Sequence, residues 1–502
     1  SKDLLNWDFI TPEKWYFEGC NAPAAHNYKD SVLYVCGNPS GAMSILYTDN
    51  PKRGDWKAVP SVLHDLQDPA LFIDDDERAY MYWGSSNRWP IRGKELDMKN
   101  KFLPIAKKPD SLLFLRPDIH GWERFGENHT SDIKPFIEGA WMTKHNGKYY
   151  LQYAAPGTHF NVYGDGVYVG KSPLGPFEYA AHNPFCYKPG GFATGAGHGS
   201  TVCGPGGIYW HFGTIHLSIN YKFERRLCMF PTFFDEDGAM YSDTYFGDYP
   251  HYSPDQVSRQ TTSGGFRGWM LLSYGKPVKA SSQLESYPVE NVTDENLKTF
   301  WVAEKNDDKQ WVEIDLEEVS DVYALQLNFF DYEETGFWGR MPNLRQRYLV
   351  EASVDGARWR VLVDYRNSFR DAPHNYIELD QPIEARYIRY RHHYVPGKNL
   401  AMGDIRVFGL GRGKKPATVK GFTVVREADE RNARISWKAV KGAQGYNVLW
   451  GVALDKLYSS WMVYGDNSLD LRALTVGQKY YFAIESFNEN GISQRVFLRE
   501  AH

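Results

Sequence analysis

A short motif recurs four times in the first half of the chain, and this repeat constrains the fold more than any other feature. The copies are Ala22-Pro23-Ala24, Asp68-Pro69-Ala70, Glu138-Gly139-Ala140 and His198-Gly199-Ser200, and twelve positions after each first member comes an aromatic residue: Tyr34, Tyr80, Tyr150 and Trp210. A repeat of roughly 40 to 70 residues made of short strands and turns is typical of β-propeller blades, whose innermost strands face a shared axis. The repeat therefore predicts that Asp68, Glu138 and His198 converge on the axis of a propeller.

Turn chemistry and composition support an all-β fold. The chain is 16% aromatic with 45 Gly and 27 Pro, and turns such as Lys144-His145-Asn146-Gly147-Lys148 separate the strands within a repeat. We expect five blades, four of them between about residues 19 and 241. The segment Ser1 to Trp7 has the pattern of a blade's ending, so we expect this first blade to be truncated, with its inner strand upstream of Ser1.

Charge and hydropathy exclude several classes of partner. The net charge is −5 with both signs mixed along the chain, so neither nucleic acid nor an anionic membrane is an expected partner. No run of 18 apolar residues is present, and we therefore expect no membrane span.

Three motifs in order resemble those of glycoside hydrolase family 43. They are Leu66 to Asp76, Ile137-Glu138-Gly139-Ala140 with Lys148-Tyr149-Tyr150-Leu151, and Gly197-His198-Gly199-Ser200. The resemblance covers about residues 1–245 and implies a five-bladed propeller that acts on arabinosides, xylosides or galactosides. It implies that Glu138 is the general acid, that Asp68 modulates the pKa of the acid and orients it, and that His198 is an axial histidine holding a cation or water. The family's general base is an Asp of the first blade, which no residue here matches, so we expect it upstream of Ser1.

The chemistry of glycoside cleavage suits these residue types. A general acid must keep its proton near neutral pH, and the apolar neighbours of Glu138 together with the negative charge of Asp68 favour its protonated form. An inverting reaction, which the resemblance implies, places the acid and base carboxyls roughly 6.5–9.5 Å apart. The alternative for Glu138 is a buried structural carboxylate that backbone donors satisfy.

Other residues are candidates for the sugar pocket. We expect Trp83 and Trp141 to wall it, with Tyr163 a further candidate, and Arg225 to supply a guanidinium; their alternatives are packing between blades and a surface charge. His198 is a candidate substrate contact and axial metal ligand, although calcium prefers oxygen, so water would have to complete its shell. The alternative for His198 is a satisfied core imidazole.

The second half of the chain predicts two β-sandwiches. Residues 274–410 contain Lys279-Ala280-Ser281-Ser282, Gln310-Trp311-Val312-Glu313-Ile314 and Asp404-Ile405-Arg406-Val407-Phe408, and they resemble a discoidin (factor five/eight type C) domain, a jelly roll shared with carbohydrate-binding module family 32. That resemblance implies a loop calcium with Asp294 as ligand. Phe337, Trp338 and Tyr394 are stacking candidates, the alternative being a domain that only buttresses the propeller. Residues 416–502 resemble a fibronectin type III domain, with Trp437 in its core and Tyr480 as tyrosine corner.

The sequence as a whole predicts a propeller over residues 1–265 followed by these two sandwiches. We expect an exo-acting, inverting glycoside hydrolase that removes arabinofuranosyl, xylosyl or galactosyl units, galactofuranosyl included, from plant-type polysaccharide in the periplasm or outside the cell. It requires no cofactor, and calcium is expected only on the propeller axis and in the discoidin domain. The alternative is a propeller that binds carbohydrate but lacks the base and does not cleave it.

Overall fold

The structure is a computed structural model that describes residues 1–8, 10, 21–29, 32–38, 43–63, 66–108, 110–216, 225–257, 265–330, 332–333 and 344–498. These residues form β-strands and short 3-10 helices, with no α-helix among them. The 3-10 helices are η1 (Pro51–Arg53), η2 (Met98–Asn100), η3 (Gly121–Glu123), η4 (Glu127–His129), η5 (Pro205–Gly207) and η7 (Val289–Val292). Within this described part, no helix has the length and apolarity needed to cross a membrane.

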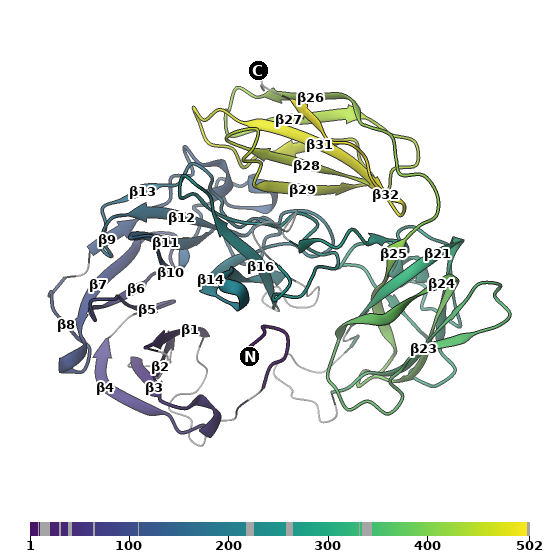
Figure 1. Cartoon of the computed structure of the whole chain (residues 1–502), viewed down its shortest axis with the longest axis horizontal. Coiled ribbons are helices and arrows are strands. Elements are labelled where there is room, and N and C mark those ends of the chain that lie inside the picture. The colour runs from purple at the N-terminus through teal and green to yellow at the C-terminus, as the bar shows by residue number, and fades with distance from the viewer. Residues whose placement is uncertain are drawn as a thin grey trace.

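In the described part of the first domain the strands form four antiparallel sheets, and in each the strands pair in the order in which they follow along the chain. The first contains β1 (Asn21–Tyr28), β2 (Val32–Asn38), β3 (Met43–Thr48) and β4 (Lys57–Leu63); the second β5 (Ala70–Ile73), β6 (Ala79–Trp83), β7 (Ile91–Asp97) and β8 (Leu103–Pro104), with β9 (Asp110–Leu113) beside β7. The third contains β10 (Glu138–His145), β11 (Lys148–Ala155), β12 (Gly164–Gly170) and β13 (Phe177–Tyr179); the fourth β14 (Gly197–Cys203), β15 (Tyr209–His216), β16 (Arg225–Phe234) and β17 (Met240–Ser242). Figure 1 shows them arranged as propeller blades, with β1, β5, β10 and β14 innermost.

The hairpin between β10 and β11 forms at the predicted turn. His145 pairs with Lys148, and the two residues between them, Asn146 and Gly147, have φ angles of 48° and 72°. Two successive left-handed residues match the twist of the flanking strands, and Asn and Gly adopt this backbone at the lowest cost. The turn chemistry in the sequence therefore fixes where β10 ends and β11 begins.

The N-terminal residues pack beside the fourth blade. Residues 1–8 form no strand; Leu4 joins a cluster with Ile208 and Trp210, and the ring of Trp7 meets that of Phe212 edge-on at 6.2 Å between centroids. A fifth blade that includes this segment stays a prediction. The predicted start of the next blade, at about residue 19, lies outside the described residues.

The second domain is a β-sandwich built on one long, folded sheet. Its strands are β18 (Met270–Leu271), β19 (Val278–Ala280), β20 (Trp301–Val302), β21 (Trp311–Phe329), β22 (Arg347–Ser353), β23 (Arg360–Asp364), β24 (His374–Tyr394) and β25 (Ala401–Leu410), paired as β18-β25-β21-β24-β22-β23 with β19 on β21 and β20 on β25. Val312, Ile314 and Leu316 alternate with more exposed residues along β21, the period of two that a half-buried strand needs. Because β18 pairs with β25, the sheet begins shortly before the predicted boundary at residue 274.

The third domain is a sandwich of a three-stranded and a five-stranded sheet. The strands are β26 (Lys420–Arg426), β27 (Ala433–Lys438), β28 (Gly445–Gly451), β29 (Ser459–Tyr464), β30 (Ser468–Leu471), β31 (Tyr481–Asn488), β32 (Gly491–Ile492) and β33 (Val496–Leu498). Trp437 is buried in its core, and the hydroxyl of Tyr480 accepts the backbone N–H of Thr475 at 3.2 Å, as a tyrosine corner does. Membership of the fibronectin type III family stays a prediction.

The first and third domains share one packed core. A single hydrophobic cluster contains Trp122 of the propeller and Trp437 of the third domain. At their boundary the N–H of Gly121 donates to the carbonyl of Leu474 at 2.8 Å, and a Cβ atom on this glycine would lie 2.5 Å from the carbonyl oxygen of Arg472. Glycine is required for this close backbone approach, so the third domain is an integral part of the packing of the propeller.

Candidate active site

The inner strands carry their candidate residues at a local distortion of the strand. The pairing register of β1, β10 and β14 shifts within the repeat motif, as in a β-bulge. One residue per motif has a left-handed backbone: Ala22 (φ 47°), Asp68 (50°), Gly139 (65°) and His198 (50°). For a non-glycine residue this costs roughly 1–3 kcal/mol, and such strain concentrates at functional sites. Bulges also redirect side chains, here toward the axis.

The register predicted for Glu138 is wrong by one residue. The left-handed residue of β10 is Gly139, so Gly139 is the counterpart of Asp68 and His198. Strand pairing agrees, because the register shift spans Glu138 to Trp141 in β10 and Gly197 to Ser200 in β14. Glycine takes the strained position at little cost, and the acid occupies the position before it. Sequence spacing could not reveal this, since the motif keeps the same length.

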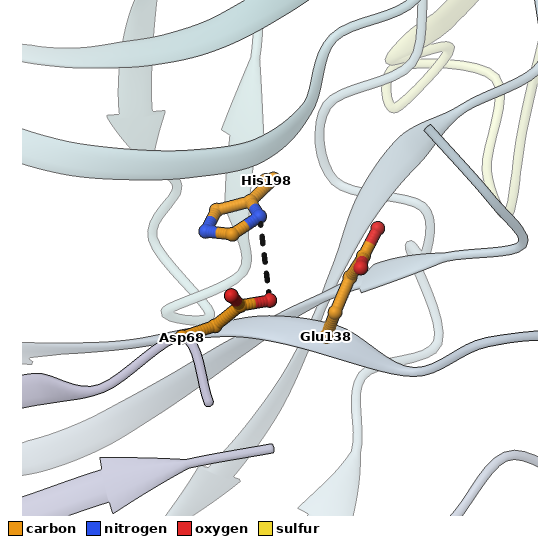
Figure 2. A group of neighbouring side chains, drawn as sticks. All are labelled: Asp68, Glu138 and His198. Carbon is orange, nitrogen blue, oxygen red and sulfur yellow. Dashed lines mark ion pairs between the residues drawn. The ribbon is translucent and has the colours of Figure 1, made fainter. Parts of the chain in front are cut away.

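Asp68, Glu138 and His198 nevertheless meet, which confirms the predicted convergence. One ligand atom from each, two carboxylate oxygens and an imidazole nitrogen, lie within 4.8 Å of one another. The Nδ1 atom of His198 is 3.7 Å from Oδ2 of Asp68, and Figure 2 shows the Glu138 carboxyl group beside this pair. Asp68 is buried, whereas Glu138 and His198 are half-buried and open to a ligand.

Two hydroxyl groups hold the carboxylate of Glu138. The Oγ atom of Ser85 donates to Oε2 at 3.0 Å, and the hydroxyl of Tyr163 donates to Oε1 at 2.6 Å. Burial, followed by the charge of Glu138, raises the pKa of Tyr163 well above its usual value, so Tyr163 keeps its proton and stays a donor. The sequence suggested Tyr163 only as a pocket wall and gave no signal for Ser85, because both approach Glu138 from loops of other segments.

A buried carboxylate, which the sequence did not indicate, fixes the backbone that carries His198. Asp165 of β12 has no exposed surface, and its two oxygens accept the backbone N–H groups of His198 and Gly199, each at 2.8 Å. His211 lies 3.1 Å from the same carboxylate. Two charge-assisted hydrogen bonds to consecutive amides hold the strained turn, so Asp165 positions His198 through the main chain.

The other predicted pocket residues lie in different surroundings. Trp83 is 9% exposed and belongs to a cluster with Cys36 and Ile45 of the neighbouring blade, so packing accounts for this side chain. Trp141 is half-buried, and its Nε1–H donates to the carbonyl of Thr201 at 3.1 Å, which ties β10 to β14. The guanidinium of Arg225 donates to the hydroxyl of Thr158, between β11 and β12. A substrate contact by Trp141 or Arg225 stays a prediction.

Two places suit a cation by the chemistry of their donors. Asp68, Glu138 and His198 would supply two oxygens and a nitrogen, and a calcium ion there would need further oxygens. In the second domain, Asp294 accepts hydrogen bonds from Thr299 and from the backbone of Asn296.

Near Asp294, the fully buried Asp404 strengthens the case for a cation. Burial, and then the charges of Glu295 and Asp294, raise the pKa of Asp404 well above its ordinary value. Its Oδ2 atom has no hydrogen-bond partner among the described residues. An orphaned carboxylate oxygen fits a cation, so calcium beside Asp294 stays a prediction that these residues allow. Of the stacking candidates, Tyr394 lies under the guanidinium of Arg345, and Phe337 and Trp338 fall outside the described residues.

The fold and site define a class of protein: a β-propeller with an acidic centre on its inner strands, followed by two packed β-sandwiches. Residues 1–240 match the model of glycosyl hydrolases family 43, and residues 277–402 match that of the F5/8 type C domain. The N-terminal part of the chain therefore belongs to glycosyl hydrolases family 43, and the second domain is an F5/8 type C domain.

Several curated proteins resemble parts of the chain. A beta-xylosidase of Xylanibacter ruminicola is 34% identical over 133 residues, which are 22% of this chain and 39% of that protein. An arabinoxylan arabinofuranohydrolase of Bacillus subtilis (strain 168) is 30% identical over 33% of this chain and 34% of its own length. The chain spans about two fifths or less of the first curated relatives it matches. Among solved structures, the GH43 BlXynB protein from Bacillus licheniformis aligns with 95% of this chain and 74% of its own, at 13% identity and a TM-score of 0.37.

Proposed function

We propose that the protein is an exo-acting, inverting glycoside hydrolase in which Glu138 is the general acid. The observation that carries this proposal is the meeting of Glu138 with Asp68 and His198, which come from three different blades. A half-buried carboxyl group that two hydroxyls hold in place is oriented for donating a proton to a glycosidic oxygen.

Asp68 suits the role of modulator and is poorly placed to be the base. One oxygen of its carboxylate lies within 4.8 Å of one oxygen of Glu138, whereas the carboxyl groups of an inverting pair are roughly 6.5–9.5 Å apart to admit the attacking water. At this distance Asp68, together with His198, can fix where the Glu138 carboxyl group lies, which is the orienting part of that role. The base is then a further carboxylate, which we expect from outside this pair.

The names of the relatives suggest the substrate class. They include a beta-xylosidase, an arabinoxylan arabinofuranohydrolase and a beta-D-galactofuranosidase of Aspergillus niger. We therefore propose that the protein removes arabinofuranosyl, xylosyl or galactosyl units, galactofuranosyl included, from plant-type polysaccharide, and that it works in the periplasm or outside the cell.

The test compares hydrolysis of aryl arabinofuranoside, xyloside and galactofuranoside by the full-length protein and by Glu138→Gln. With a poor leaving group, the substitution should lower kcat at least about 100-fold; an activated dinitrophenyl leaving group needs no proton, so its loss should be much smaller. Glu178→Gln, an exposed glutamate of β13, is the matched control and should keep full activity. Equal activity of Glu138→Gln on both kinds of substrate would end the assignment.

The alternative is a propeller that binds carbohydrate without cleaving it. This alternative holds if no further carboxylate serves as base, since Asp68 and Glu138 lie too close to act as acid and base together. A protein that binds the sugar but hydrolyses none of the three aryl glycosides would establish it.

A further inference from the structure

A cavity of about 550 Å³ lies between the first and second domains, away from Asp68 and Glu138. Its lining includes Phe192 and Leu227 of the propeller and Asn328, His374 and Tyr376 of the sandwich. A second cavity of about 380 Å³ shares Met229, Phe230 and Tyr376 with the first, so the two form one cleft along β16. Cavities of roughly 300–1,000 Å³ at domain interfaces are typical binding sites for small molecules.

A buried ionic network holds the two walls of this cleft together. Arg406 of β25 is 1% exposed and donates to both carboxylate oxygens of Glu295, at 2.9 and 2.7 Å, and to the carbonyl of Asp248 at 2.8 Å. Asp248 in turn pairs with Lys188 of the propeller at 2.8 Å. These contacts cross the domain boundary with little freedom, so the cleft exists before any ligand enters it.

The chemistry of the walls favours a neutral, hydroxyl-rich ligand. The charges of the network neutralise one another, and Arg226 is a further cation of the lining. The half-buried amide of Gln326 and imidazole of His374 supply hydrogen-bonding groups to the cavity. Asn328 is buried and already bonded to His374 and Asp404. The ring of Tyr376 is 43% exposed and Leu227 is 76% exposed. Aromatic and aliphatic faces with a few amide and imidazole groups are what a sugar ring needs: stacking on its C–H face and hydrogen bonds to its hydroxyls.

One loop separates this cleft from the candidate active site. Phe192, between β13 and β14, lines the cavity. From the same loop, the hydroxyl of Thr194 donates to Asn161 at 2.9 Å, and the N–H of Ala196 donates to the carbonyl of Tyr163, also at 2.9 Å. Tyr163 is the residue whose hydroxyl holds Glu138. A sugar chain in the cleft would therefore lie one loop away from the general acid.

We propose that the cleft between the propeller and the F5/8 type C domain is a second carbohydrate-binding site, which takes a neutral stretch of the polymer whose terminal or side unit enters the active site. The choice of ligand class rests on the proposed function. The existence of the site does not rest on the proposed function, because binding in the cleft requires no hydrolysis. Because the second domain forms one wall of this cleft, binding there raises the local concentration of polymer near Glu138.

The test measures polysaccharide binding in the Glu138→Gln background, so that the ligand stays intact. Affinity electrophoresis in gels containing neutral arabinoxylan, and calorimetry with linear xylo-oligosaccharides and arabino-oligosaccharides, would compare this parent with added Tyr376→Ala or Leu227→Arg. The first removes the stacking ring and the second places a charged chain across the rim. Phe114→Ala, which removes a 55% exposed ring outside the cleft, is the matched control.

We expect retardation of the parent and the control by the neutral polymer, and about tenfold weaker binding of both cleft variants. Circular dichroism and thermal unfolding would show that all the variants are folded, since the altered side chains are exposed. Equal retardation of all the variants, no retardation of the parent, or tighter binding of anionic polygalacturonate than of arabinoxylan would each overturn the proposal. Failure of the unaltered protein to cleave aryl glycosides would instead count only against the hydrolase assignment.

Discussion

Glu123 should make the stability of the protein fall as the pH rises, and Glu123→Gln should remove this dependence. The side chain has no exposed surface, and its carboxyl group accepts hydrogen bonds from the hydroxyl of Tyr153 and the backbone N–H of Arg116. Burial nonetheless raises the pKa of Glu123 from 4.5 to about 8, because these two donors only partly replace the lost water.

The magnitude follows from the linkage between protonation and folding. Because the pKa is higher in the folded state, the contribution of Glu123 to stability is fully present below about pH 4.5. It is lost progressively as the pH rises and falls no further above about pH 8. The difference in pKa corresponds to a loss in the free energy of unfolding, relative to low pH, of about 5 kcal/mol above pH 8 and about 3 kcal/mol at pH 7. Glutamine carries no titrating proton, and its amide leaves one of the two donors without an acceptor, at a cost of about 1–3 kcal/mol at every pH.

Urea unfolding from pH 5 to pH 9, followed by tryptophan fluorescence, measures this effect, since the neighbouring Trp122 is fully buried. The free energy of unfolding of the unaltered protein should fall relative to that of Glu123→Gln by about 1.4 kcal/mol per pH unit between pH 5 and pH 8. The variant should be the less stable protein at pH 5 and the more stable one at pH 9. Other titrating groups cancel in the comparison. Parallel curves for the two proteins would refute the reasoning.

Three further substitutions test the site and the domain junction. Tyr163→Phe removes one of the two hydroxyl donors to the general acid and should lower kcat on aryl glycosides roughly ten- to hundredfold; unchanged kinetics would deny it a positioning role. Asp165→Asn leaves one amide of the His198 turn without an acceptor and the other with an uncharged one. It should cost about tenfold in kcat/KM, while a rate like that of the unaltered protein would show that the turn holds without the carboxylate. Arg406→Met leaves Glu295 buried without its cation and should lower the free energy of unfolding by about 3–5 kcal/mol at neutral pH, measured by denaturant; a smaller loss at low pH, where the carboxyl is protonated, is expected, and a pH-independent loss would contradict this explanation.

Much of the fold could be read from local patterns. The spacing of the motifs around Asp68 and His198 predicted blades, and Asn146-Gly147 predicted a tight hairpin, because turn residues and strand alternation act over a few positions. The same locality explains one error: the motif around Glu138 has the length of the others, but the strained position falls on Gly139. A register shift of one residue is decided by strand pairing, which a single motif does not contain.

The candidate site divides in the same way. Asp68, Glu138 and His198 could be named from the repeat, since Glu138 and His198 lie on the inner strands of their blades and Asp68 comes two residues before the start of β5. Ser85 and Tyr163 could not, because each approaches Glu138 from a loop that carries no motif. Trp83 illustrates the converse, since its residue type suggested a sugar contact and its neighbours make it part of the core.

The amino-acid sequence by itself determined which segments become strands, where they turn, and which titratable groups stand on the inner strands, because these depend on nearest neighbours along the chain. Only the tertiary structure decided that Asp165 holds the turn of His198, that Arg406 joins two domains, and that a cleft opens between them. Those features depend on atoms brought together from distant parts of the chain. Their energies come from burial and from paired charges, which exist only once the domains have packed.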